Sequence, residues 1–99
     1  MIRPIRTAKP ASEELTAAVQ WYERQRSGLG GELFDAILGT IDRISDTPEA
    51  GSSFRTLDVR RMLVAGFPYQ IVYRIRADEI RILAFAHLRR RPAFWRHRR

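Results

Sequence analysis

The spacing of apolar residues changes once along this chain, near residue 54, and this change constrains the fold more than any other feature. Before it, apolar side chains recur every three to four residues in two stretches, as on one face of an α-helix. After it, apolar and polar residues alternate, as in β-strands with one buried face. A chain whose helices come first and whose strands follow predicts an α+β domain. The length of 99 residues suits a single domain over residues 1–99.

Two helices are predicted in the first half of the chain. One apolar stripe runs over residues 9–27 and stops at Gly28, and a second runs over residues 31–46 and stops before Pro48. Residues 29–31 are predicted to be the hinge between them. So short a connection predicts an antiparallel helical hairpin.

The strands are predicted to form an antiparallel meander, with turns at residues 66–68 and 77–79 and a loop at 48–53. Residues 54–57 and 59–64 are two strands or one strand bent at Asp58. In chain order, the predicted strands are residues 2–7 (as an edge strand), 54–57, 59–64, 69–76 and 80–86.

The helical hairpin can cover only one face of this sheet. Alternation places Val72, Leu83 and Phe85 on the face opposite to Ile71 and Ile82. This second face is therefore partly apolar and needs a cover. Either the chain's own loops and C-terminal residues pack there, or a segment of a partner protein does.

Charge and cysteine content narrow the classes of function. The formal net charge is +7, and Lys9 is the one lysine among 18 basic residues. Such a charge favours a polyanionic partner, either a nucleic acid or an acidic protein. The absence of cysteine excludes disulfides and thiolate metal sites, and predicts a reducing, cytoplasmic environment. No apolar run approaches the ~20 residues of a membrane span, so we expect no membrane partner.

Residues 87–99 carry the densest chemistry, with six arginines around Phe94 and Trp95. Arginines neutralise phosphates, and aromatic rings can stack on exposed bases. Alternatively, Trp95 closes the core and the arginines are solvated. Pro92 could begin a short final helix.

We predict no metal site and no cofactor. His87 and His97 have no third ligand at a recognisable spacing. The acidic pairs Glu13–Glu14 and Asp42–Asp46 are typical of solvated helix faces rather than of a catalytic pair.

Several short motifs, taken in order, resemble the RelE/ParE superfamily of toxins from type II toxin–antitoxin systems. In the first half they are residues 18–23 (Ala-Val-Gln-Trp-Tyr-Glu), Leu29-Gly30, Phe34 and Pro48. In the second half they are Val59-Arg60-Arg61, Phe67-Pro68-Tyr69-x-Ile71-x-Tyr73, Ile80-x-Ile82-Leu83-Ala84-x-Ala86-His87 and Arg91-Pro92-x-x-Trp95-x-x-Arg98.

This resemblance implies a β-α-α-β-β-β fold and a cognate acidic antitoxin that binds the toxin in a hetero-oligomer. RelE-like members cut mRNA on the ribosome, whereas ParE-like members inhibit DNA gyrase. A RelE-like activity would rest on Arg61, His87 and Arg90. Leu63 and Gln70 stand where basic residues of the nuclease are expected, and this departure favours the ParE-like branch.

The sequence therefore leaves three functions open: a ParE-like gyrase inhibitor, a RelE-like ribosome-dependent endoribonuclease, and a non-toxic nucleic-acid-binding module. In each case we expect the same side chains, all of them basic except Trp95, to contact the partner or target. They are Arg60, Arg61, Arg74, Arg89, Arg90, Arg91, Trp95, Arg96 and Arg98.

Overall fold

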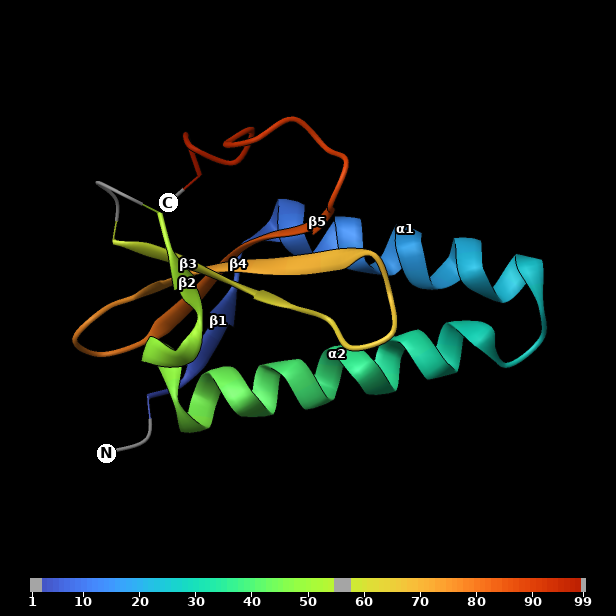
Figure 1. Ribbon diagram of the computed structural model, residues 1–99, viewed down its shortest axis with the longest axis horizontal. Helices are drawn as coiled ribbons and strands as arrows, with labels where there is room; N and C mark the ends of the chain where they lie inside the picture. Colours follow the sequence, from blue (N-terminus) through green and yellow to red (C-terminus); the bar gives the residue numbers. More distant parts are fainter. Residues whose placement is uncertain (1–2, 55–57, 99) are drawn as a thin grey trace.

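The computed structural model describes residues 3–54 and 58–98 of the chain. Two helices pack on one face of a five-stranded sheet, and the C-terminal residues lie over the other face (Figure 1). The elements are β1 (Ile5–Thr7), α1 (Lys9–Gln25), α2 (Leu29–Asp46), a 3-10 helix η1 (Pro48–Ala50), β2 (Ser52–Ser53), β3 (Val59–Leu63), β4 (Tyr69–Ile75) and β5 (Ile80–His87). The predicted α+β class, with a helical hairpin on one face of the sheet, is confirmed.

The hinge of the helical hairpin lies earlier than predicted. α2 begins at Leu29, so residues 29–31 form its first turn, and Gly28 precedes it with a φ of 91°. Gly30 allows the two helices to approach closely, because a Cβ atom there would lie 2.6 Å from the carbonyl oxygen of Val19. The Glu23 carboxylate accepts hydrogen bonds from the N–H groups of Gly28 and Gly30. An acid from α1 thus binds backbone N–H groups at the start of α2 that have no partner within the helix. The glycine-rich sequence alone did not reveal this contact.

The sheet is mixed rather than wholly antiparallel, in the order β1-β5-β4-β3-β2. β1 is an edge strand, as predicted, but it runs parallel to β5, with Ile5 opposite Ile80. The other three pairings are antiparallel. β2 falls within the segment 48–53 that was predicted to be a loop. Phe54, which was predicted to begin a strand, is not part of β2. The rest of the predicted strand at 54–57 lies outside the described residues.

The main core fills the space between the helices and the sheet. Leu33 and Ile37 on α2 are fully buried there, against Ile71 and Tyr73 on β4. Thr40 is the polar residue buried among them, and its hydroxyl donates a hydrogen bond to the carbonyl oxygen of Ala36. Burial of this apolar area is the largest favourable contribution to folding.

A β-bulge in β5 corrects the predicted position of Phe85. Val72 pairs with Ala84, whereas Tyr73 pairs with Ile82, so Leu83 is an extra residue. The extra residue shifts the alternation of side chains by one place. Phe85 therefore faces the helices, where its ring stacks on Tyr69 at 4.6 Å, whereas Val72 and Leu83 face the other side.

The chain's own C-terminal segment, residues 88–98, covers the second face of the sheet. Trp95 is 3% exposed and packs with Val59, Val72, Leu83 and Ala84. Of the two covers considered from the sequence, the chain's own C-terminal residues are therefore the one observed, rather than a segment of a partner protein. The segment is a series of turns rather than the short helix expected after Pro92. The N–H groups of Arg96 and Arg98 each bond to the carbonyl oxygen three residues back.

Candidate functional site: an arginine-rich face

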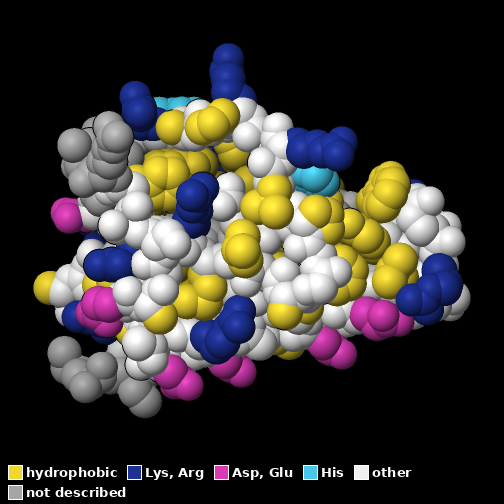
Figure 2. Space-filling view, viewed as in Figure 1, with side chains coloured by type: hydrophobic (Ala, Val, Ile, Leu, Met, Phe, Trp, Pro, Cys, Tyr) yellow, Lys and Arg dark blue, Asp and Glu magenta, His cyan; other side chains and the backbone are white. Residues whose placement is uncertain are grey.

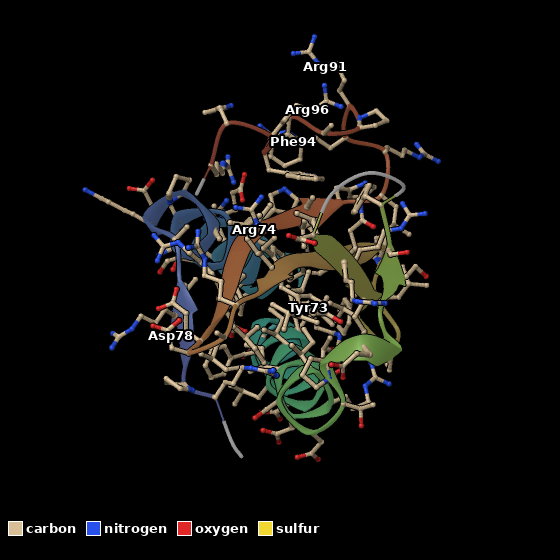
Figure 3. The ribbon with its side chains drawn as sticks, turned by 90° about the vertical axis from the view of Figure 1, so that its left-hand side faces the viewer. Tyr73, Arg74, Asp78, Arg91, Phe94 and Arg96 are labelled. Atoms are coloured by element: carbon tan, nitrogen blue, oxygen red, sulfur yellow. The ribbon has the colours of Figure 1, made fainter. Side chains whose placement is uncertain are left out.

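The C-terminal segment presents several of the predicted arginines to solvent. Arg89, Arg90, Arg91 and Arg96 are exposed, and Figure 3 shows Arg91 and Arg96 projecting away from the sheet. In Figure 2 dark blue basic side chains lie along the upper edge of the view, and most magenta acidic ones lie below, over α2. We call the exposed guanidinium groups of Arg61, Arg89, Arg90, Arg91 and Arg96 the arginine face.

A groove runs from the edge of the sheet to this segment. Its wider part, of about 700 Å³, is lined by Arg43, Ala50, Gly51, Ser52, Arg61, Met62, Leu63, Ala65, Gln70 and Leu88. It shares Arg61, Gln70 and Leu88 with a smaller hollow of about 70 Å³ beneath Arg90 and Arg91. No acidic residue is among those that line either part. The Gln70 side-chain oxygen is buried without a hydrogen-bond partner in the described structure.

These features give the groove a definite chemical preference. Guanidinium groups favour anionic ligands, and arginine can bond carboxylate or phosphate with two N–H groups. Of the arginines that line the groove, Arg90 is already bonded to the Glu14 carboxylate. A peptide with acidic side chains supplies such anionic groups.

Arg60 and Arg74 are less available than the sequence predicted. Arg60 donates hydrogen bonds to the carbonyl oxygens of Glu49 and Gly51, at 3.0 and 2.8 Å. It therefore ties β3 to the 3-10 helix. Arg74 is partly buried on the second face, and its Nε has no partner in the part of the chain that is described.

Trp95 supports the arginine face from beneath. Its ring is nearly buried and meets Phe54 edge to face, with the ring centres 5.0 Å apart. In this conformation it holds the segment to the sheet and has no broad surface to offer a partner. The sequence had left open whether Trp95 closes the core or contacts a partner, and the structure shows the first.

Glu14 was predicted to be solvated, and the structure instead makes it a largely buried acid that is paired with two arginines. Its carboxylate accepts hydrogen bonds from both terminal nitrogens of Arg98, at 2.9 and 3.1 Å, and from one terminal nitrogen of Arg90, at 3.2 Å. The Glu14 side chain is only 16% exposed. The sequence pattern could not reveal this, because 84 residues separate Glu14 from Arg98.

The three residues expected for a RelE-like activity do not meet at one site. Arg61 and Arg90 line the smaller hollow, but His87 is not among its lining residues. His87 instead lines a cavity of about 330 Å³ beside α1, together with Trp21, Tyr69 and Arg90.

The hydrogen bonding of His87 also does not suit a general base. Its Nδ1 accepts the backbone N–H of Arg89 at 3.0 Å, so in the neutral ring the proton is on Nε2. A general base needs an unprotonated nitrogen that faces the substrate. The nitrogen that could accept a proton is already engaged within the chain.

The buried Tyr73 and the partly buried Tyr69 have shifted acidity. Burial raises the pKa of Tyr69, and its neighbour Tyr22 raises it further. Burial also raises the pKa of Tyr73, whose hydroxyl donates a hydrogen bond to the carbonyl oxygen of Pro48. Tyr73 belongs to the main core and Tyr69 packs against it, and both remain neutral phenols at physiological pH.

The described residues contain neither a group of three potential metal ligands nor a helix long and apolar enough to cross a membrane. The fold and the arginine face together define a small basic α+β domain with exposed guanidinium groups on one side of its sheet.

Comparison with known proteins identifies the family. Residues 5–92 match the family described as the ParE toxin of type II toxin–antitoxin systems, parDE, and the chain belongs to this family. The ParE-like branch favoured by the sequence is thereby supported. No curated protein sequence matches the chain.

A solved structure shares the fold. It is described as the chromosomal ParDE toxin–antitoxin system from P. aeruginosa. A chain of that structure is 17% identical to this one, with a TM-score of 0.72 over 87% of this chain and 96% of the other. At this level of identity the likeness concerns the fold.

Proposed function

We propose that this chain is a toxin that is neutralised by a cognate acidic antitoxin and that acts by inhibiting DNA gyrase. The observation that carries the antitoxin half is the groove lined by Arg43 and Arg61 that continues beneath Arg90 and Arg91, because no carboxylate lines it. An acidic segment placed there would pair with Arg43, Arg61 and Arg91, which line the groove. Membership of the ParE toxin family and the likeness to a chain of the P. aeruginosa toxin–antitoxin system support such a partner and a hetero-oligomer.

The antitoxin half is tested by expressing the chain alone and together with the product of the neighbouring reading frame. We expect growth arrest in the first case, and rescue with copurification of a small acidic protein in the second. Arg61→Glu should weaken the complex at least tenfold, because charge reversal at a buried interface costs well over about 1.4 kcal/mol. The matched control is Arg24→Glu, an exposed residue of α1 outside the groove. Equal effects of the two variants would contradict the proposed position of the antitoxin.

The gyrase half rests on the family and on the separation of His87 from the Arg61 and Arg90 hollow. A toxin of this kind acts by binding, and the exposed arginines offer it a contact surface. The purified chain should inhibit DNA supercoiling by gyrase, and added antitoxin should restore the activity. Unchanged supercoiling at a large excess of the chain would contradict this half.

The runner-up function is the ribosome-dependent endoribonuclease, which is favoured by one observation: Arg61 and Arg90 line the same hollow and could together bind a phosphate. Mapping of mRNA ends in a translating extract separates the two. Cleavage that Arg61→Gln abolishes would replace the gyrase proposal, and intact messages would remove the alternative. Binding of nucleic acid alone, without toxicity, would instead favour the third function, and its affinity should fall steeply with salt.

A further inference from the structure

The edge of β5 is only partly covered by another strand. β1 pairs with Ile80–Ile82 and then ends, and the last backbone bond of this kind runs from the N–H of Ala8 to the carbonyl oxygen of Ile82. Beyond this point, side chains bond the edge of β5. Arg98 donates to the carbonyl oxygen of Leu83 at 3.0 Å, and the N–H of Phe85 donates to Glu14 Oε1 at 3.1 Å. The ion pair thus continues the hydrogen bonding that β1 began.

Glu14 joins three parts of the chain at this edge. Oε1 accepts hydrogen bonds from Phe85 N–H and Arg98 Nη1, and Oε2 accepts from Arg98 Nη2 and Arg90 Nη1. One carboxylate on α1 thereby binds β5 and both ends of the C-terminal segment. The side chains of Glu14 and Arg98 are 16% and 13% exposed, so water competes little for these bonds.

An aromatic ring links the two arginines a second time. The Arg90 guanidinium carbon lies 3.7 Å from the centre of the Phe94 ring, and that of Arg98 lies 5.1 Å from it. Both distances fit cation–π contacts. The segment contains no helix or strand, so these contacts, its turn hydrogen bonds and the buried Trp95 determine its conformation.

We propose that Glu14 is a positioning residue that holds residues 88–98 against the sheet and so presents Arg89, Arg91 and Arg96 as a fixed binding surface. Arg90 and Arg98 bind Glu14, and Arg90 stays half exposed as part of the arginine face, whereas Arg89, Arg91 and Arg96 are exposed and bond no carboxylate among the described residues. Preorganisation of this kind increases affinity, because the partner does not have to order the segment when it binds. This second half of the inference rests on the proposed function.

The first experiment tests the positioning itself. The chain has two tryptophans, and Trp21 is half exposed, so Trp21→Phe leaves Trp95 as the single fluorescent reporter. In that background Glu14→Gln should shift the Trp95 emission to the red and increase its quenching by acrylamide. The amides of Arg96 and Arg98 should exchange at least about tenfold faster, while those of α2 stay protected. Glu13→Gln is the matched control, because Glu13 is exposed beside Glu14.

A milder substitution at the partner residue, Arg98→Lys, keeps this test decisive if Glu14→Gln fails to fold. Arg98→Lys retains the charge but lacks the paired N–H groups that reach both carboxylate oxygens. It should give the same red shift and faster exchange to a smaller extent. Unchanged emission and exchange in either folded variant would overturn the inference.

The second experiment tests the consequence for binding. In the supercoiling assay, the concentration of Glu14→Gln needed for half inhibition should rise at least about tenfold over that of Glu13→Gln. If the segment loosens but both variants inhibit equally, the segment's position does not matter for the target, and this half is wrong. If the unmodified chain does not inhibit gyrase, the proposed target fails, and the fluorescence result still decides the role of Glu14.

Discussion

The two faces of the sheet are covered in different ways. α1 and α2, of 17 and 18 residues, cover one face with regular apolar stripes, and Leu33 and Ile37 are fully buried there. The other face has a smaller cluster around Trp95, under a segment of turns that carries several arginines (Figure 3). The helical face depends on many apolar contacts that form together. The second face depends on the smaller cluster around Trp95, with Phe54 and Phe94 packed against it, and on the Glu14 carboxylate.

This difference separates stability from binding within one small domain. Charged side chains are costly to bury, so the face that carries the main core excludes them. The second face can carry arginines because a short irregular segment leaves most of their guanidinium groups in solvent. We therefore expect substitutions on the helical face to change the free energy of unfolding, and substitutions on the second face to change mainly local order and binding.

The largest effect is expected from Leu33→Ala on the helical face. Leu33 has no exposed surface, so its truncation leaves a cavity and should cost about 2–5 kcal/mol of unfolding free energy. Urea denaturation measures this value. The neighbouring Phe34 is 43% exposed, and Phe34→Ala should cost far less. Similar losses in the two variants would show that α2 does not pack as described.

A smaller effect is expected from Trp95→Ala, although Trp95 is the larger residue. Its loss should free residues 93–98 locally, so the cost is limited to the free energy that holds this segment, about 2 kcal/mol. Hydrogen exchange should show faster exchange at Arg96 and Arg98, with protection retained in β4 and α2. A loss as large as that of Leu33→Ala, with exchange faster throughout, would mean that the two faces unfold as one unit.

The helical face was the more predictable of the two. The apolar stripes on α1 and α2 follow from local periodicity, and so do the turns that separate β3, β4 and β5. The bulge at Leu83 could not be foreseen, because alternation alone cannot show where an extra residue enters a strand. The parallel pairing of β1 also depends on how the chain returns after the helices, and no local pattern records that.

The second face was predictable only in composition. The sequence indicated that the C-terminal arginines need an anionic partner, but it did not indicate that two of them already have one in Glu14. Helical position suggested a solvated acid there, since residues 13 and 14 lie in the exposed start of a helix. Long-range ion pairs leave no spacing pattern, so they are found from the fold.

A moderate effect is expected from Tyr73→Phe, at the edge of the helical core. The Tyr73 hydroxyl donates to the carbonyl oxygen of Pro48, and its removal leaves a buried acceptor without that donor. The expected cost is about 1 kcal/mol of unfolding free energy. Thermal or urea denaturation measures it. A cost near zero would mean that water replaces the hydroxyl.

The same residue predicts a dependence on alkaline pH. Burial raises the pKa of Tyr73 above its ordinary value of 10.0, so the folded chain keeps a proton that the unfolded chain releases. This contribution is fully present below pH 10 and is lost as the pH rises through the folded-state pKa. Tyr69 acts in the same direction. Denaturation between neutral and strongly alkaline pH should therefore show a steeper loss in the unmodified chain than in Tyr73→Phe, and equal slopes would contradict the assignment.

The smallest effect on stability is expected from Arg91→Gln, which tests whether the second face contributes to binding rather than to folding. Arg91 is exposed, and no hydrogen bond or ion pair of its side chain occurs among the described residues, so the unfolding free energy should change by less than about 0.5 kcal/mol. Association with an acidic antitoxin should nevertheless slow, because exposed charges steer encounters between oppositely charged surfaces, and the difference from the unmodified chain should fade at high salt. Stopped-flow measurements at two salt concentrations test both expectations. An association rate that is unchanged at low salt would show that the antitoxin approaches elsewhere, and a large loss of stability would show that the arginine face contributes to folding after all.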